Sequence, residues 1–471
     1  MPHKNQRGLS RRGLLIGGGA AVAAAGAAGF VMRKKLTNLI DRKTVLASFS
    51  ATPPLVPHDA AKEKTTLYVG RDGGPAANVD TALTKLGGMS KVVGVDDVVI
   101  IKVSAQWWNQ GMTNVAAVKR AIEHVLEIPG FKSEVIVFEN THFHVPDKKP
   151  DDPARGLTRA WSHPSDRNVD VPGWNKLADL IPHFAGLGAP VSFYGLVDGG
   201  GSALSGDPWF DPEHVHGVYG GDDRGPVAAG DARDGYHWDF DKLFRLRRSR
   251  VRHARTPLTW PRFTSPRTGA VIDLRDGVLR RAQGALAKDG RALKFINMTT
   301  ANEHGSTGFT GACKSPMGIV DMSAGALGTH PRVQGYQSVH YFGRTGRPDG
   351  EKDPTWRMAG PLAYWNNEVR RADLYLTVAE WIAVTPTSGY DGSDDMRHHA
   401  ACAFKAGHVV AGTDPVAIDA WCVKHVVGPN ASKYKDMLAL DNPGAKVSRF
   451  LRYFRQAAGW GTLDESLVTV A

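Results

Sequence analysis

Continuous apolar runs alternate with helical spacing in the first third of the chain. Residues 93–105 (VGVDDVVIIKVSA) carry a nearly unbroken β-branched run, which predicts a buried strand. Residues 113–128 place apolar side chains at helical spacing, with Thr113 or Asn114 as the N-cap. Residues 133–140 (SEVIVFEN) form a second buried apolar run. This order of strand, helix and strand predicts a βαβ unit and therefore a parallel sheet.

The apolar pattern extends this sheet toward the carboxyl terminus. Further strands are predicted within residues 189–201, 291–300, 371–386 and 407–428. The last of them leads through a turn into a helix that begins near Pro415. Residues 271–287 (VIDLRDGVLRRAQGALA) predict a strand or turn that leads into a helix. We therefore expect an α/β fold with a mostly parallel twisted sheet built from βαβ units, in a single domain over residues 46–471.

Two long stretches interrupt the pattern, at about residues 145–188 and 199–268. Both are rich in Pro, Gly, Asp and Arg and show weak periodicity. Their tryptophans and tyrosines need surfaces against which to pack, so we expect ordered loop insertions rather than disordered linkers.

The N-terminal segment has the pattern of an export signal. The stretch SRRGLLIGGGAAVAAAGAAGFVM pairs Arg11 with Arg12 and continues as a weakly hydrophobic Gly/Ala-rich run to Met32. Residues 1–45 are therefore predicted to be a twin-arginine signal or an N-terminal anchor, because an uncleaved run of about 19 residues can just span a bilayer. We expect the twin-arginine translocation machinery as a partner and an exported location, in the periplasm or cell envelope.

The net charge of +11 comes from two segments and does not indicate nucleic-acid binding. Residues 1–45 carry +8 and residues 242–267 carry +9, which leaves −6 for the rest of the chain. No basic stripe runs through the core motifs, so nucleic acid is not expected as a partner. Residues 242–267 are expected to form a solvated arm or to contact an anionic membrane surface. Clamping of carboxylates or phosphates by their arginines is the alternative.

The cysteines exclude one class of cofactor site. Cys313, Cys402 and Cys422 show no C-x-x-C spacing, so the sequence has no iron–sulfur cluster motif and no disulfide framework. One pair could bond after export, and the spacing does not say which.

Polar residues gather where the predicted strands end. Ligands bind beyond the carboxyl ends of the strands in open parallel sheets, so these residues are the first candidates for a site. Lys102 interrupts a buried run, which is costly unless its amine meets an anion or a carboxylate. It is either a site lysine or the structural partner of a neighbour such as Glu139. Later strands supply further candidates, namely Asn297, Glu303, His304, Lys314, Asp414 and Asp419.

Residues 308–315 (GFTGACKS) are one residue away from the phosphate-binding loop G-x-x-x-x-G-K-[ST]. Cys313 replaces the second glycine, and Pro316 follows where a helix should continue, so a nucleotide site is not expected. Lys314 could lower the pKa of Cys313 and make it a nucleophile, although a small buried cysteine is the commoner case.

The same glycine-rich stretch can serve a different purpose. Its glycines allow close approach to a ligand, and successive backbone amides can hold an anion. We expect the loop to bring His304 and Lys314 to one rim of the sheet, together with Thr307 and Thr310.

Paired histidines raise the alternative of a metal site. His142 and His144 follow the strand at residues 133–140, and alternate residues of a strand share a face. With Glu139 they form a candidate site for a transition metal, whose identity the sequence leaves open. The chain has 18 histidines, so some such pairs arise by chance.

Four stretches resemble one family, the domain of unknown function 362. They are similar to its strand-lysine motif, its asparagine strand with a Gly/Thr loop ending in lysine, its aspartate-bearing strand and its closing Gly-x-Asp-Pro-x-Ala-x-Asp signature. These stretches read DDVVIIKVSAQWWNQGMTN, FINMTTANEHGSTGFTGACKSPMG, RADLYLTVAEWIAVTP and VVAGTDPVAIDAWC. The resemblance covers most of residues 66–426 outside the insertions.

The resemblance implies a site made of residues that match these motifs, namely Lys102, Asn297, His304, Lys314, Asp373, Asp414 and Asp419. The interest of Asp373 is entirely inherited from the family. Two departures stand out. Val103 and Ser104 occupy positions where family members often have Pro-Asn, and the ferredoxin-like cysteine motifs of many members are missing.

Taken together, these patterns predict an exported cell-envelope enzyme that binds a metal or organic cofactor and an anionic or carbonyl-bearing substrate. Lys102 and Lys314 are expected to neutralise negative charge, His304 to act as acid, base or ligand, and Asp414 to orient or ligate. Expected cofactor contacts are Asn297, Thr307, Thr310, Asp373 and Asp419. Redox and hydrolytic chemistry both stay open, and the alternative is a non-catalytic ligand-binding or maturation protein of the cell envelope.

Overall fold

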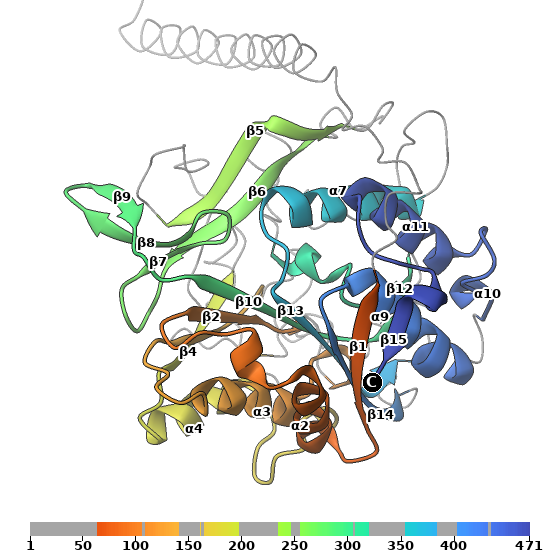
Figure 1. Cartoon of the computed structure of the whole chain (residues 1–471), viewed down its shortest axis with the longest axis horizontal. Helices are drawn as coiled ribbons and strands as arrows, with labels where there is room; N and C mark the ends of the chain where they lie inside the picture. Colours follow the sequence, from red (N-terminus) through yellow and green to blue (C-terminus); the bar gives the residue numbers. More distant parts are fainter. Residues whose placement is uncertain are drawn as a thin grey trace, which may run out of the picture. The chain divides into compact units, whose positions relative to one another are not determined.

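The computed structural model describes residues 64–105, 109–140, 161, 164–196, 234–245, 255–304, 307–319, 354–383, 403–431 and 435–471. Within these ranges an eight-stranded sheet has the order β15-β1-β14-β13-β10-β2-β3-β4 (Figure 1). Its strands are β1 (Thr65–Arg71), β2 (Val98–Lys102), β3 (Val135–Asn140), β4 (Val191–Leu196), β10 (Leu293–Thr300), β13 (Leu374–Ala383), β14 (Ala403–Gly412) and β15 (Val468–Val470). The predicted α/β class is confirmed.

The sheet is parallel through its centre and mixed at one side. Strands β4, β3, β2, β10 and β13 are neighbours in that order, and each pair is parallel. Strand β14, by contrast, pairs antiparallel with both β13 and β1. In this register Asn297 of β10 lies between Lys102 of β2 and Tyr375 of β13. Two residues singled out from the sequence are therefore neighbours across the central strands.

Helices cover both faces of the sheet (Figure 1). One face packs against α2 (Pro75–Leu86), α3 (Val115–Leu126) and α4 (Leu180–Gly186). The other packs against α7 (Pro354–Glu368), α9 (Pro415–Cys422) and α11 (Lys446–Ala458). The shorter helical segments are η2 (Met89–Lys91), η3 (Asn109–Gly111), η5 (Leu177–Asp179), η6 (Ser315–Gly318), the π-helical η7 (Val423–Val427), η8 (Gly428–Asn430), α10 (Lys435–Leu438) and η9 (Glu465–Leu467).

The predicted helix starts are confirmed at two positions. The Asn114 side chain accepts a hydrogen bond from the Ala117 backbone N–H and so caps α3, the second of the two residues expected there. Pro415 is the first residue of α9, as its fixed φ favours.

Strand alternation assigns side chains to the two faces. Val99 and Ile101 belong to the core beneath α2, α3 and α4, whereas Val98 and Ile100 belong to the core beneath α7, α9 and α11. Lys102 lies on the same face of β2 as Val98 and Ile100, and Asn297 lies on the corresponding face of β10. Both side chains therefore face the α7, α9 and α11 layer.

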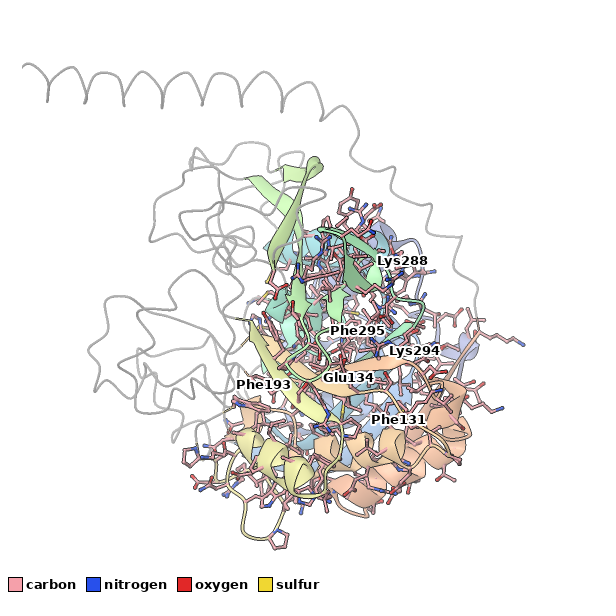
Figure 2. The ribbon with its side chains drawn as sticks, turned by 90° about the vertical axis from the view of Figure 1, so that its left-hand side faces the viewer. Phe131, Glu134, Phe193, Lys288, Lys294 and Phe295 are labelled. Atoms are coloured by element: carbon pink, nitrogen blue, oxygen red, sulfur yellow. The ribbon has the colours of Figure 1, made fainter. Side chains whose placement is uncertain are left out.

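A second, antiparallel sheet is formed by β5 (Gly235–Arg245), β6 (Arg255–Thr264), β7 (Val271–Asp273), β8 (Gly277–Ala282) and β9 (Ala285–Lys288). Its Phe263 ring stacks on Tyr194 of β4 at 4.0 Å and on Phe138 of β3 at 5.5 Å. Figure 2 labels Glu134, which precedes β3. Ser265 donates a hydrogen bond to its buried carboxylate. These contacts fasten the second sheet to the edge of the first.

The helix predicted within residues 271–287 is wrong. Strands β8 and β9 form a hairpin whose two connecting residues, Gln283 and Gly284, have φ of 48° and 81°. Two successive positive φ values are those of a type I′ turn, which matches the twist of paired strands. Local turn geometry thus outweighed the helical spacing of the apolar residues.

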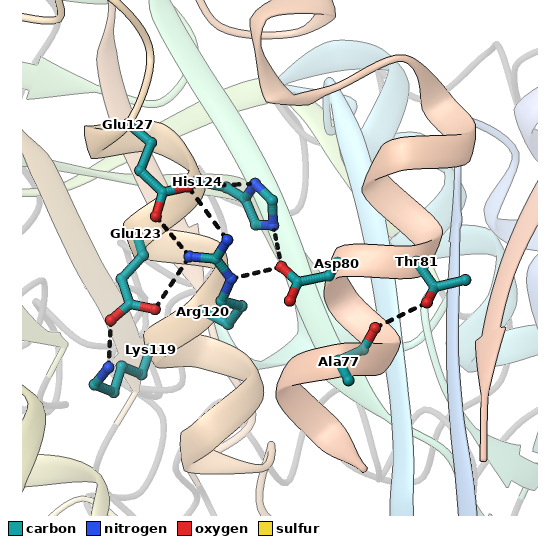
Figure 3. A network of polar contacts seen from close by, with 8 residues as sticks. All are labelled: Ala77, Asp80, Thr81, Lys119, Arg120, Glu123, His124 and Glu127. Atoms are coloured by element: carbon teal, nitrogen blue, oxygen red, sulfur yellow. Dashed lines mark hydrogen bonds and ion pairs between the residues drawn. The ribbon is translucent and has the colours of Figure 1, made fainter. Parts of the chain in front are cut away.

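A partly exposed network of charged side chains joins α2 to α3 (Figure 3). Arg120 donates to Asp80 at 2.5 Å and to Glu127 at 2.7 Å, and His124 Nε2 lies 2.7 Å from the same Asp80 oxygen. Every group in this network has a partner and access to water. Among the described residues, none of the helices has both the length and the apolar character needed to cross a bilayer.

Candidate functional site

Lys102 and Glu139 form a buried ion pair at the carboxyl ends of β2 and β3. Lys102 Nζ lies 2.7 Å from Glu139 Oε2, and the two side chains are only 4% and 2% exposed. Gly318 closes against the pair, because a Cβ atom there would lie 2.4 Å from Glu139 Oε1 and 3.3 Å from Lys102 Nζ. The cost of burying Lys102 is therefore met by the Glu139 carboxylate, a partner that a site lysine and a structural lysine would both need.

Asn297 lies beside this pair with half of its amide satisfied. Its Oδ1 accepts a hydrogen bond from Ser315 Oγ at 2.7 Å, which ties η6 to β10. Its Nδ2 is buried and has no hydrogen-bond partner in the described part of the chain. A buried amide donor without a partner is costly, so this group is available to a ligand.

Lys314 is buried without a carboxylate partner among the described residues. Its side chain amine donates to Thr310 Oγ1 at 3.3 Å, and the residue is 6% exposed. Burial, followed by the positive charge of Lys102, lowers the pKa of Lys314 to about 7. The two buried lysines therefore lie within electrostatic reach of each other, and the amine of Lys314 loses its proton easily.

Asp419 holds the turn that carries Lys314. Its two oxygens accept hydrogen bonds from the backbone N–H groups of Ala312 at 2.7 Å and Cys313 at 2.9 Å. Gly311 allows this approach, since a Cβ there would lie 2.3 Å from Asp419 Oδ1. Burial raises the pKa of Asp419 to about 7. Asp419 thus positions the turn from α9, and its oxygens are used within the chain.

The stretch GFTGACKS differs structurally from a phosphate-binding loop. Lys314 is followed by η6, a 3₁₀ turn of four residues, rather than by a helix whose N-terminus could face a phosphate. Burial and the Asp419 carboxylate raise the pKa of the Cys313 thiol well above its usual value. Cys313 is therefore a buried thiol and a poor nucleophile.

Two of the expected aspartates bind backbone groups elsewhere. Asp414 caps α9 by accepting from Val416 and Ala417, and its other oxygen accepts from the Thr462 N–H at 2.8 Å.

Asp373 stands just before β13 and accepts from the Phe295 N–H at 2.8 Å. Lys294 and Arg370 also form ion pairs with Asp373. Both aspartates hold the fold together next to the site.

His304 and Thr307 belong to a small hairpin of β11 (Asn302–His304) and β12 (Gly308–Thr310). The Thr307 N–H donates to His304 Nδ1 at 3.3 Å, and Thr307 Oγ1 donates to the Phe309 carbonyl at 2.7 Å. Thr310, at the end of this hairpin, is the residue that contacts Lys314. His142 and His144, expected with Glu139 as metal ligands, lie outside the described residues.

Glu303 carries an unpaired buried carboxyl group. Its residue is fully buried, and neither oxygen has a hydrogen-bond partner in the part of the chain that the structure describes. Burial raises the pKa of Glu303 to about 8, so the group holds its proton at neutral pH. The sequence placed Glu303 among the strand-end polar residues but gave it no role.

Two further residues of this face were missed from the sequence. Ser315 was passed over although it directly follows Lys314, and its hydroxyl binds Asn297. Thr377 of β13 is buried with an unpartnered hydroxyl, and it pairs across the sheet with Thr299 of β10. A threonine within a β-branched strand gives no sequence signal that separates it from a core residue.

The group that the structure brings together consists of Lys102, Glu139, Asn297, Thr310, Lys314 and Ser315, and we call it the lysine cluster. It offers hydrogen-bond donors in excess, from two amines and one amide. Such a set suits an anion or a carbonyl oxygen rather than a cation. Among the described residues no group of three or more His, Cys, Asp or Glu side chains could hold a metal ion.

The family model of the domain of unknown function DUF362 matches residues 285–424. The resemblance predicted from the four motifs is thereby confirmed for this segment, which includes β10, the β11–β12 hairpin, Lys314 and α9. No curated protein and no solved structure is similar enough to this chain to count as a match.

Proposed function

We propose the function from the lysine cluster itself, because the family model that matches residues 285–424 is that of a domain of unknown function. The chain is an enzyme that binds a small anionic, carbonyl-bearing molecule at the carboxyl ends of β2 and β10. The amine of Lys314 is its reactive group. The observation that carries this proposal is a buried lysine whose described partner is one neutral hydroxyl, beside a second buried lysine.

The first argument is the surplus of buried donors. Lys102 is balanced by Glu139. Among the described residues, Lys314 has only Thr310 as a partner, and Asn297 Nδ2 has none. Buried polar groups are normally hydrogen-bonded, and an unpaired donor costs about 1–3 kcal/mol. A carboxylate or carbonyl oxygen would satisfy these donors. A ligand of this chemistry therefore recovers free energy that the unliganded protein lacks.

The second argument is the protonation state of Lys314. With a pKa of about 7, its amine is largely neutral just above neutral pH. A neutral amine can accept a proton from carbon or attack a carbonyl carbon, whereas an ammonium can do neither. The positive charge of Lys102 assists both steps, because it favours the negative charge that develops on the carbonyl oxygen.

The test follows exchange of the methyl protons of pyruvate in D₂O by NMR. Pyruvate is the smallest molecule with both a carboxylate and a neighbouring ketone. We expect the wild type to speed exchange above the buffer rate and Lys314→Met to fall to that rate. Lys132→Met serves as the matched control, because Lys132 is 70% exposed and pairs with Asp96 at the surface.

The outcomes separate the two classes of function. Exchange that persists in Lys314→Met contradicts the role given to this amine. Stabilisation by pyruvate without exchange contradicts the enzymatic proposal and favours a non-catalytic ligand-binding protein. Thermal unfolding of each variant shows whether a lost rate reflects a lost fold.

We also propose that the chain is exported by the twin-arginine route, as a protein of the periplasm or cell envelope. The support is the paired Arg11 and Arg12 followed by the Gly/Ala-rich run, all within residues that the structure does not describe. A fusion of residues 1–45 to a reporter that is active only after export tests the proposal. Replacing both arginines by lysine should retain the reporter in the cytoplasm, and unchanged export contradicts the proposal.

A further inference from the structure

We infer that Lys314 forms a covalent imine with the carbonyl carbon of a 2-oxo carboxylate. This inference rests on the proposed function and narrows it to one substrate class and one kind of chemistry. Hydrogen bonds just before and just after Lys314 in the sequence fix the position of the turn that carries its amine.

The turn that carries Lys314 is held firmly. Asp419 binds the two backbone N–H groups that precede Lys314, and Ser315 binds Asn297 directly after it. The Lys314 backbone carbonyl also accepts from the Met317 N–H at 3.0 Å. A nucleophile gains most when its carrier is rigid, because less freedom is lost as the bond forms.

The surroundings of the amine suit a nucleophile rather than a structural cation. A structural lysine in the interior needs a carboxylate, and the chain supplies one to Lys102 but none, among the described residues, to Lys314. Desolvation and a neighbouring cation are the two conditions that activate a lysine for imine formation. Lys314 meets both, since it is buried and Lys102 lies within electrostatic reach.

The remaining donors match the rest of a 2-oxo carboxylate. Asn297 lies in register with Lys102 and holds its unpaired Nδ2 on the same face of the sheet. An amide donor and an ammonium can bind the carboxylate oxygens while the ketone faces the amine. A simple aldehyde or ketone lacks the carboxylate and would leave these donors unpaired. We therefore expect the site to bind such a compound more weakly than a 2-oxo carboxylate.

The covalent step balances as follows. The Lys314 nitrogen lone pair attacks the ketone carbon, a C–N bond forms, and the C=O π electrons move to oxygen. A proton passes from nitrogen to that oxygen, giving a carbinolamine. The C–O bond then breaks as a proton from solvent joins the departing hydroxide to form water. The nitrogen keeps its remaining hydrogen, so a protonated C=N bond remains. The protonated imine draws electrons from the neighbouring carbon and acidifies its C–H bonds.

The experiment traps the imine in the folded full chain. Pyruvate is added with sodium borohydride, which delivers hydride to the imine carbon while solvent protonates nitrogen. Intact mass and peptide mapping then locate the adduct. We expect one adduct per chain, on Lys314, formed by the wild type and by Lys132→Met but absent from Lys314→Met. Acetone, which has no carboxylate, should give at least tenfold less.

The outcomes also distinguish this inference from the proposed function. Proton exchange of pyruvate that depends on Lys314, without any adduct, keeps the proposed function and overturns the imine. Neither exchange nor adduct overturns both. An adduct mapped to another lysine overturns the inference directly, and this readout needs only the wild type.

Discussion

Two groups of charged side chains, one on each side of the sheet, lie in opposite environments. Between α2 and α3, Asp80, Arg120 and His124 form a partly exposed network in which each side chain has a charged partner. Beneath α7, α9 and α11, charged and polar groups are buried, and several have no partner among the described residues. Glu303 is the sharpest case, and Lys314 has one hydroxyl as its described partner.

This contrast separates structure from function. Exposed ion pairs contribute little and are easily replaced, so they explain only how two helices meet. Buried unpaired groups lower stability, and a chain keeps them where a ligand completes their interactions. The second face is therefore where the activity of the chain should be sought.

The largest effect should come from breaking the buried ion pair. Glu139→Gln leaves Lys102 charged and unpaired, so we expect a loss of about 3–5 kcal/mol in the free energy of unfolding. Denaturant unfolding measures it. Lys102→Met combined with Glu139→Gln should recover most of the loss, because the uncompensated charge is gone. A loss that the double variant does not relieve would show that the pair is not the cause.

Glu303→Gln should change how stability depends on pH. The folded pKa of Glu303, about 8, lies above its ordinary value of 4.5. The protonated group therefore contributes stability that is complete below about pH 4.5 and is lost as the pH rises through about 8. Relative to the variant, the wild type should lose up to about 5 kcal/mol across this window, because each pKa unit corresponds to about 1.4 kcal/mol. Parallel curves of unfolding free energy against pH would contradict the assignment.

Gly318→Ala tests how tightly η6 closes over the ion pair. The added methyl would meet Glu139 Oε1, so we expect a destabilisation of about 1–3 kcal/mol. Gly186→Ala is the control, because a Cβ there meets nothing within 4 Å. Equal thermal unfolding of the two variants would mean that the close approach at Gly318 is unimportant.

The smallest effect should come from the partly exposed network between α2 and α3. Asp80→Asn removes the shared partner of Arg120 and His124, yet we expect a loss below about 1 kcal/mol that shrinks further in high salt. Denaturant unfolding at low and high salt measures it. A loss as large as that of Glu139→Gln would erase the contrast between the two faces.

The sequence was sufficient for the central sheet and for much of the lysine cluster. Buried β-branched runs located β2, β3 and β10, and the cost of a lysine within such a run singled out Lys102. It was not sufficient for the second sheet, where a turn at Gln283 and Gly284 replaced an expected helix. The hydrogen bonds that engage Asp414 and Asp373 depend on long-range packing, which local spacing cannot reveal. The lack of a partner for Glu303 within the described ranges depends on it as well.

The central claim is that a neutral buried amine at Lys314 awaits an anion. Calorimetric titration of the wild type with oxalate at pH 8, in buffers of different ionisation enthalpy, measures the protons taken up on binding. The second carboxylate of oxalate takes the place of the uncharged ketone that a 2-oxo carboxylate would present to Lys314. Since the pKa of Lys314 is about 7 before binding, this carboxylate should raise it and draw up to one proton per chain from the buffer. The uptake should fall below pH 7 and be missing in Lys314→Met. Failure to bind oxalate, or binding without proton uptake at pH 8, contradicts the claim.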